Sequence, residues 1–89
     1  MYKVIYSRSA LKDLKKIERF LAQGIIKKIA FFSQQKDLHS FSSPLKGFGK
    51  QIFRFRIGNY RAIFKIDKSG KIHILMILNI KHRKDIYFT

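Results

Sequence analysis

The fold is decided by residues 51–66, which read QIFRFRIGNYRAIFKI. Apolar and polar residues alternate on both sides of Gly58-Asn59, as in two antiparallel strands joined by a two-residue turn. Successive side chains of a strand point to opposite faces, so the apolar ones share a face. They are Phe53, Phe55, Ile57, Tyr60, Ala62, Phe64 and Ile66; the opposite face carries Arg54, Arg56, Arg61 and Lys65. The stretch predicts a β-hairpin with one apolar and one cationic face.

This register places Arg56 directly opposite Arg61. Like charges that face each other across two strands destabilise a sheet. A fold that keeps two arginines opposite each other indicates that they have a function, and two positive charges together favour the binding of an anion. The alternative is a cationic face that is simply solvated.

The charge of the whole chain supports an anionic partner. Lys and Arg number 20 against five Asp and Glu, which gives a net charge of +15 on 89 residues. Self-repulsion of this size opposes compaction and predicts a nucleic acid, an acidic protein, or both as partners. The cations are spread over the expected helices and strands alike, so a membrane surface is not the expected partner.

Composition is that of a small packed domain. Hydrophobic residues make up 46% of the chain, with nine Phe and four Tyr, which is unlike a disordered basic tail. There is no Cys, so a disulfide framework is excluded and a reducing compartment suits the chain. No secretory signal is visible, nor any apolar run of the ~18 residues that a membrane span needs. We expect one cytoplasmic domain over residues 1–89.

The rest of the chain predicts two further strands, two helices and a loop. Residues 2–6 alternate as a strand, and Ser7 stands where a helix N-cap is expected. Apolar residues then recur at helical steps, with a break at Gly24: Ala10, Leu11, Leu14, Ile17, Phe20 and Leu21 before it, and Ile25, Ile26, Ile29 and Phe32 after it. Residues 35–50 read as a loop, and 72–80 as a central strand that is apolar on both faces. We expect an α+β fold, in which an N-terminal strand and a two-helix hairpin pack on a four-stranded, mostly antiparallel sheet.

Three segments carry a resemblance to a known family. They are Leu45-Lys46-Gly47 in the loop, the hairpin from Arg54 to Arg61, and the ending His82-Arg83-Lys84-Asp85-Ile86-Tyr87. With the order of elements, they resemble the RelE/ParE toxin superfamily over essentially the whole chain. The resemblance implies the toxin of a type II toxin–antitoxin pair. The RelE branch cleaves mRNA in the ribosomal A site without a metal, whereas the ParE branch poisons DNA gyrase.

The resemblance also implies roles for single residues. Metal-free RNA cleavage needs a base for the ribose 2′-hydroxyl, an acid for the leaving 5′-oxygen and cations for the phosphate. Arg61 matches the family's hairpin arginine, a phosphate clamp with a planar fork. Arg54 and Arg56 match basic positions of the preceding strand, and Tyr87 matches a terminal tyrosine that stacks on a base or removes the proton. Further expected RNA contacts are Lys46, Lys65 and Lys81.

The general acid has three candidates at the end of the last strand. His82 ranks first, because imidazole exchanges protons near neutrality, followed by Arg83 and then Lys81. If the strand continues, alternation puts Lys81 and Arg83 on one side and His82 on the other, so the three cannot all serve. Residues 46–51 hold no carboxylate, which argues against the Glu/His pair of some relatives.

We therefore expect a ribosome-dependent endoribonuclease that inhibits translation and is neutralised by an acidic antitoxin. The antitoxin is expected to cover the basic face or to displace the C-terminal segment. The alternatives are a ParE-like gyrase poison and a non-catalytic member that only binds a partner. No metal or cofactor is expected, because three scattered His without Cys do not make a zinc site. The aromatic face of the hairpin is expected to be core under the helices rather than a base-stacking surface.

Overall fold

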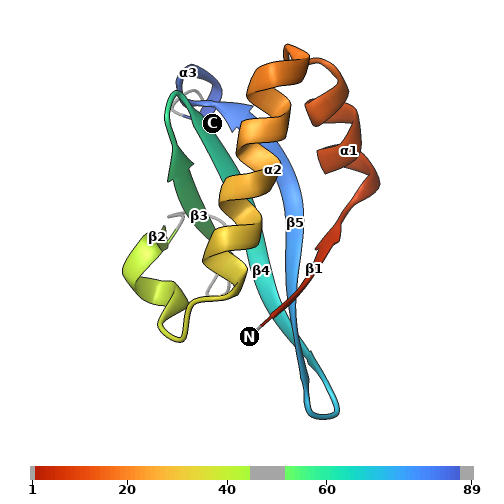
Figure 1. Cartoon of the computed structure of the whole chain (residues 1–89), viewed down its shortest axis with the longest axis vertical. Coiled ribbons are helices and arrows are strands. Elements are labelled where there is room, and N and C mark those ends of the chain that lie inside the picture. The colour runs from red at the N-terminus through yellow and green to blue at the C-terminus, as the bar shows by residue number, and fades with distance from the viewer. Residues whose placement is uncertain (1, 45–51, 87–89) are drawn as a thin grey trace.

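The computed structural model describes residues 2–44 and 52–86 (Figure 1). Its elements are β1 (Lys3–Tyr6), α1 (Arg8–Lys15), α2 (Arg19–Ser33), the 3-10 helix η1 (Leu38–Phe41), β2 (Ser42–Pro44), β3 (Ile52–Ile57), β4 (Tyr60–Ser69), β5 (Ile72–His82) and α3 (Arg83–Ile86). One sheet has the strand order β1-β5-β4-β3-β2, with β1 parallel to β5 and the other pairs antiparallel. The predicted α+β class is confirmed. The sheet has a fifth strand, since β2 lies in the segment predicted as a loop.

The hairpin of β3 and β4 has the predicted register. Ile57 pairs with Tyr60, and Arg56 pairs with Arg61. Gly58 has a φ of 58°, which glycine adopts freely and which suits the first position of a two-residue hairpin turn. The turn residues therefore fix which side chains face the helices.

The apolar face of the hairpin forms the core, as predicted. Phe55 and Phe64 are fully buried, with their ring centroids 4.1 Å apart. Phe32 of α2 lies 4.5 Å from Phe55 by the same measure, and Ile25 and Ile29 of α2 are also buried. Burial of side chains this large contributes about 1.5–3 kcal/mol each. Phe55 and Phe64 are therefore part of the core under α2 and are not available for stacking on bases, whereas Phe53 and Tyr60 are half-buried at its edge.

The helices divide at a different place from the one predicted. The sequence pattern predicted a break at Gly24, but α1 ends at Lys15 and α2 runs through Gly24. The cause is Glu18, whose carboxylate accepts hydrogen bonds from the main-chain N–H groups of Phe20 and Leu21, both at 3.0 Å, and so caps α2. As a result Phe20 and Leu21, predicted to face the core, are 78% and 51% exposed.

Beyond the end of β1, helix α1 and its N-cap lie beside the edge of β5. Strand β1 pairs only with residues 74–77 of β5. Ser7, the predicted N-cap, accepts from the first turn of α1 and donates through Oγ to the carbonyl of Leu78, 2.7 Å away. Asp13 Oδ2 accepts from the main-chain N–H of Ile80 at 2.9 Å and from the Asn79 amide at 3.3 Å. Side chains of α1 thus satisfy the part of β5 that β1 does not reach.

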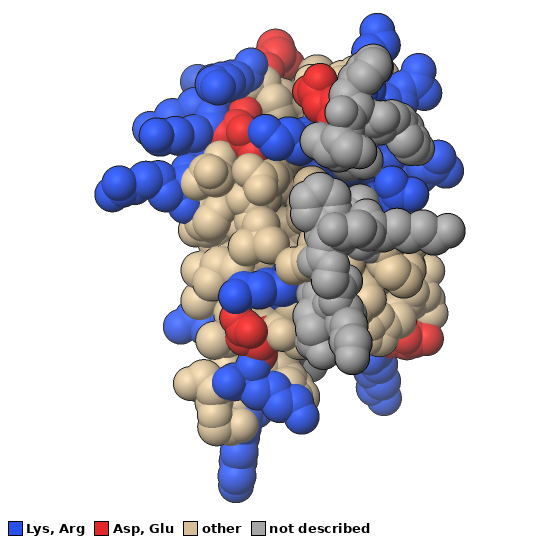
Figure 2. Space-filling view, turned by 180° about the vertical axis from the view of Figure 1, so that it is seen from behind, with Lys and Arg blue, Asp and Glu red and all other residues tan. Residues whose placement is uncertain are grey.

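The other face of the sheet is shown in Figure 2. Uncharged side chains cross its middle, and Lys and Arg gather toward its ends. By register, the half-buried Ile5, Ile63 and Met76 belong to this face. In the part of the chain that the structure describes, no helix is long and apolar enough to cross a bilayer.

Candidate functional site

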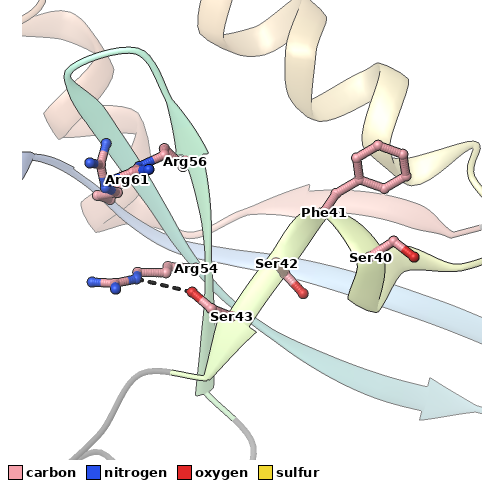
Figure 3. Close-up of a pocket in the computed structure, with 7 residues that line it drawn as sticks. All are labelled: Ser40, Phe41, Ser42, Ser43, Arg54, Arg56 and Arg61. Atoms are coloured by element: carbon pink, nitrogen blue, oxygen red, sulfur yellow. Dashed lines mark hydrogen bonds between the residues drawn. The ribbon is translucent and has the colours of Figure 1, made fainter.

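A pocket of about 330 Å³ opens beside β3, at the point where β2 begins (Figure 3). Among the residues that the structure describes, three arginines, three serines and one aromatic ring line it, and none of these is acidic. They are Ser40, Phe41, Ser42, Ser43, Arg54, Arg56 and Arg61. We call it the arginine pocket. Its donors suit an anion, because guanidinium and hydroxyl groups both donate hydrogen bonds to phosphate or carboxylate oxygens.

Three cationic residues form a row across the sheet beside this pocket. Arg56 of β3 pairs with Arg61 of β4, and Arg61 in turn pairs with Lys81 of β5. The cross-strand opposition of the two arginines, predicted from the sequence, is confirmed. Neighbouring residues of one row lie about 5 Å apart at their Cβ atoms, so their charges repel one another.

Arg61, the predicted phosphate clamp, is almost completely buried. Its exposed fraction is 4%, and Nη1 donates to the carbonyls of Gly58 at 2.9 Å and Tyr60 at 2.8 Å. The guanidinium therefore holds the hairpin turn at the same time as it lines the pocket. A cation fixed in this way is oriented before any ligand arrives.

Arg54 and Arg56 supply the more accessible charge of the pocket. Arg54 is half-buried, and its Nε donates to Ser43 Oγ at 3.2 Å, while Arg56 is exposed. Figure 3 shows both arginines extending from β3, with Arg61 beside Arg56. The serines were missed because their segment was predicted as a loop. The signal that was available is the run Ser40-Phe41-Ser42-Ser43 just before the only Pro.

Two of the three lysines expected to bind RNA, Lys65 and Lys81, each lie near a carboxylate. Lys65 Nζ is 3.5 Å from Asp67 Oδ2, and Lys81 Nζ is 3.8 Å from Asp13 Oδ1. Lys65 pairs with Ile52, at the far end of β3 from the hairpin turn. The Lys65–Asp67 pair is exposed to solvent, and such pairs contribute about 0–1 kcal/mol, so Lys65 can turn to another anion at little cost.

The backbone position of His82 belongs to the other face of the sheet from the cationic row, although His82 and Lys81 line a common pocket. It pairs with Tyr60, one position from the Arg61–Lys81 pair, so it faces the helical side of the sheet. Its ring centroid is 5.3 Å from that of Tyr60, and Nδ1 accepts from the main-chain N–H of Lys84 at 3.2 Å. The strand does not continue to Arg83, which is exposed and begins α3. Tyr87 and Lys46 lie outside the described residues.

The described residues contain no group of side chains that could bind a metal ion. Within residues 2–44 and 52–86, no three side chains of His, Asp or Glu gather closely enough to hold an ion. Burial of its phenol raises the pKa of Tyr6.

Similar structures come from toxin–antitoxin systems, although no curated protein matches the sequence significantly. The RelBE2 toxin–antitoxin complex from Mycobacterium tuberculosis contains a chain with 26% identity and a TM-score of 0.74; the alignment covers 92% of this chain and 98% of that one. The RelB–RelE complex from Methanococcus jannaschii gives 26% identity and a TM-score of 0.61, over 93% and 94%. YafQ from E. coli shares the fold, at 14% identity, with a TM-score of 0.68 over 98% and 99%.

The family assignment comes from the sequence itself. Residues 4–87 match the family described as the ParE toxin of the type II toxin–antitoxin system parDE. The match includes the hairpin, the cationic row and the end of β5, and it covers nearly the whole chain. The chain belongs to this family, and it is a toxin of the RelE/ParE superfamily of type II toxin–antitoxin systems.

Proposed function

We propose that this toxin is an endoribonuclease that cleaves mRNA in the ribosomal A site, with the scissile phosphate in the arginine pocket. The observation that carries the proposal is the convergence of Arg54, Arg56 and Arg61 on one pocket without an acidic lining residue. The likeness to chains of the RelBE2 and RelB–RelE complexes supports it. RNA is the favoured anion because its backbone brings a charge at every nucleotide to a surface with a net charge of +15.

The chemistry needs no group beyond the chain and the RNA. The ribose 2′-oxygen attacks the adjacent phosphorus, the bond from phosphorus to the 5′-oxygen breaks, and a 2′,3′-cyclic phosphate remains. Negative charge grows on the non-bridging oxygens as the bond forms. Arg56 and Arg61 stabilise it, because a cation already in position costs no reorganisation during the reaction.

Protons must leave the 2′-hydroxyl and reach the 5′-oxygen. We retain Tyr87 as the base or as a platform for a nucleobase, on the family resemblance. For the leaving oxygen we now place Lys81 before His82. Lys81 pairs with Arg61 and its ammonium carries donors, whereas His82 belongs to the opposite face of the sheet.

The proposed setting is the cytoplasm, with the ribosome and its mRNA as substrate and an acidic antitoxin as inhibitor. An antitoxin is supported by the similar chains, which were solved in toxin–antitoxin complexes. Acidic residues of the antitoxin are expected to compete with RNA for the cations around the arginine pocket.

A gyrase poison is the second candidate. The family matched by the sequence is described as the ParE toxin, and this observation favours it. The arginine pocket has no specified role in that candidate, and for this reason we rank it below the nuclease. A non-catalytic member would bind its partners and leave both mRNA and DNA intact.

The test is a cell-free translation reaction, with the 5′ ends of a reporter mRNA mapped by primer extension. New ends should appear with the wild-type toxin only where ribosomes occupy the message.

Arg56→Ala should lower the cleavage rate by about 100-fold. Its matched control is Lys27→Ala, which removes one exposed cation from α2, outside the arginine pocket, and should cleave like wild type. Cleavage of naked RNA would replace the A-site proposal with a free ribonuclease. Intact mRNA, with cleaved DNA in gyrase assays, would overturn the nuclease in favour of the second candidate.

A further inference from the structure

Phe41 lines the arginine pocket, and the phosphate chemistry described above gives it no role. It is the last residue of η1, directly before β2, and it is 39% exposed. Its neighbours in the sequence, Ser40, Ser42 and Ser43, are all polar. Proteins bind single-stranded RNA with cations for the backbone and exposed aromatic rings for the bases, and this pocket contains both.

The shortness of β2 places Phe41 beside the cations. Ser42, the first residue of β2, pairs with Phe55, so among the described residues this pairing stops one position before Arg56. At that level the chain belongs to η1, and the arginine pocket lies at this edge of β3. Figure 3 shows the arginines on one side of β3 and Phe41 on the other, toward α2. A nucleotide can therefore place its phosphate at Arg56 and turn its base past the end of β2 toward Phe41.

The ring of Phe41 is held in place by its neighbours. Its centroid lies 5.3 Å from that of Phe32, at an interplanar angle of 32°, and 6.1 Å from that of Phe31, at 83°. The short helix that carries it is anchored by Leu38, which is buried. A ring fixed before the ligand arrives loses little side-chain freedom on binding, which favours affinity.

Packing alone explains only part of this arrangement. Phe32 belongs to the core and is 5% exposed, whereas Phe31 and Phe41 remain 50% and 39% exposed outside it. The contact with Phe32 accounts for the buried part of the Phe41 ring. The exposed part contributes to the lining of a pocket whose described charged residues are all arginines.

The combination of groups favours RNA over a protein as the ligand of this ring. A nucleotide brings phosphate oxygens and a planar base within one unit, so a single unit can occupy both the arginines and Phe41. The carboxylates of an acidic protein satisfy the arginines alone, because Asp and Glu side chains carry no ring.

We propose that Phe41 is a stacking platform for the nucleobase next to the phosphate that Arg54 and Arg56 bind. The proposal rests on the proposed function and adds the position of one base to it. Stacking accepts every base, because each has a planar face, and differences in stacking strength give a modest preference among bases. Phe41 therefore influences where the toxin cleaves, separately from the role retained for Tyr87.

The test measures how strongly cleavage depends on that base. Ribosomes are programmed with messages that carry a normal or an abasic nucleotide on either side of the scissile phosphate, and single-turnover rates are compared. With wild type, loss of the base on one side should lower the rate about tenfold or more. With Phe41→Leu the rate should be about tenfold lower while the base is present, and loss of the same base should change it by less than about twofold further.

Three further variants separate stacking from other effects. Phe41→Trp retains a planar ring and should retain the dependence on the base. Phe20→Leu is the matched control, because Phe20 is 78% exposed on α2 and does not line the arginine pocket, and it should cleave like wild type. Arg56→Ala should slow normal and abasic messages by the same factor. A purely structural role of Phe41 would also slow both messages equally, with a lower thermal stability of Phe41→Leu.

Two outcomes would overturn the proposal while the proposed function stands. They are a wild-type rate in folded Phe41→Leu, and a rate in this variant that falls with the base as steeply as in wild type. Intact mRNA with the wild-type toxin would reject the nuclease instead, and fluorescence anisotropy near 0.3 M salt would then decide on Phe41. Wild type should bind a labelled trinucleotide about tenfold more tightly than the same sugar–phosphate chain without bases. The same ratio in Phe41→Leu would overturn the proposal.

Discussion

Arg56 and Arg61 are direct cross-strand neighbours, yet Arg56 is exposed and only 4% of Arg61 is. The buried guanidinium donates to two carbonyls of the hairpin turn, and its neighbour on β3 stands in solvent. The two arginines therefore have different roles in the arginine pocket. Arg61 links the site to the stability of the hairpin, whereas Arg56 contributes charge that the fold does not need.

Replacing the two arginines should have opposite effects on stability. Arg61→Ala removes the hydrogen bonds to Gly58 and Tyr60 and should lower the free energy of unfolding by about 1–3 kcal/mol. Arg56→Ala removes a like-charge neighbour and should leave that free energy unchanged or raise it by about 0.2–1 kcal/mol. Urea unfolding of both variants measures the difference. Equal losses would contradict the division of roles, and Arg56→Ala is the cleaner variant for activity assays.

Asp13 should be a structural residue although it is charged and close to Lys81. Asp13→Ala leaves the N–H of Ile80 and the amide of Asn79 without their acceptor and should cost about 1–3 kcal/mol. Asp13→Asn retains an acceptor oxygen and should cost less. Urea unfolding gives the free energies, and hydrogen exchange should quicken at the Ile80 amide in Asp13→Ala. An unchanged exchange rate would show that water replaces the carboxylate at this edge.

Replacement by alanine should raise the stability of the protein at Gly24 and lower it at Gly58. Gly24→Ala should raise stability by about 0.8–1 kcal/mol, because the new Cβ meets nothing within 4 Å and alanine favours the helix. Gly58→Ala should lower it by about 1–2 kcal/mol, because φ is 58° there. Thermal melts of both variants give the comparison. A destabilised Gly24→Ala would mean that α2 does not continue through this position in solution.

Tyr6 should make the stability of the protein depend on pH in the alkaline range. Burial raises its pKa above the ordinary value of 10.0, so the folded state keeps the proton where the unfolded chain releases it. Its contribution is full below the unfolded pKa and is lost as pH rises through the folded one. The difference in stability between wild type and Tyr6→Phe should therefore shift against wild type above about pH 10. A pH-independent difference would contradict this.

The hairpin was predictable because its information is local. Gly58-Asn59 fixes the turn, and strict alternation then fixes the face of every side chain and the opposition of Arg56 and Arg61. Alternation gives the face of a side chain but not its depth. The burial of Arg61 depends on two carbonyls of the turn beside it, a contact that no pattern of residue types displays.

The other departures have physical causes of the same kind. Glutamate is not among the favoured N-cap residues, so the cap at Glu18 gives no signal in the sequence, and the helical pattern predicts the break at Gly24 instead. Strand β2 is three residues long and contains Pro44, too short for any periodicity. Asp13 reaches Ile80 across 67 positions of sequence, beyond the range of local patterns. The choice of general acid stays a prediction: register puts His82 and Lys81 at opposite-facing positions of β5, yet both side chains line one pocket.

The parallel pairing of β1 with β5 also bears on how the chain is made. Lys3–Tyr6 is translated before the other strands of the sheet, its partners Ile74–Ile77 belong to the strand that is translated last, and β5 is the strand between β1 and β4. Because translation proceeds from the N-terminal side, β1 has no neighbour in the sheet until β5 has been translated. A product of interrupted translation that stops before Ile72 lacks the strand that joins the two parts. The sheet is therefore completed only after β5 has been made, and chains that terminate before this strand should be substrates for proteolysis rather than toxins.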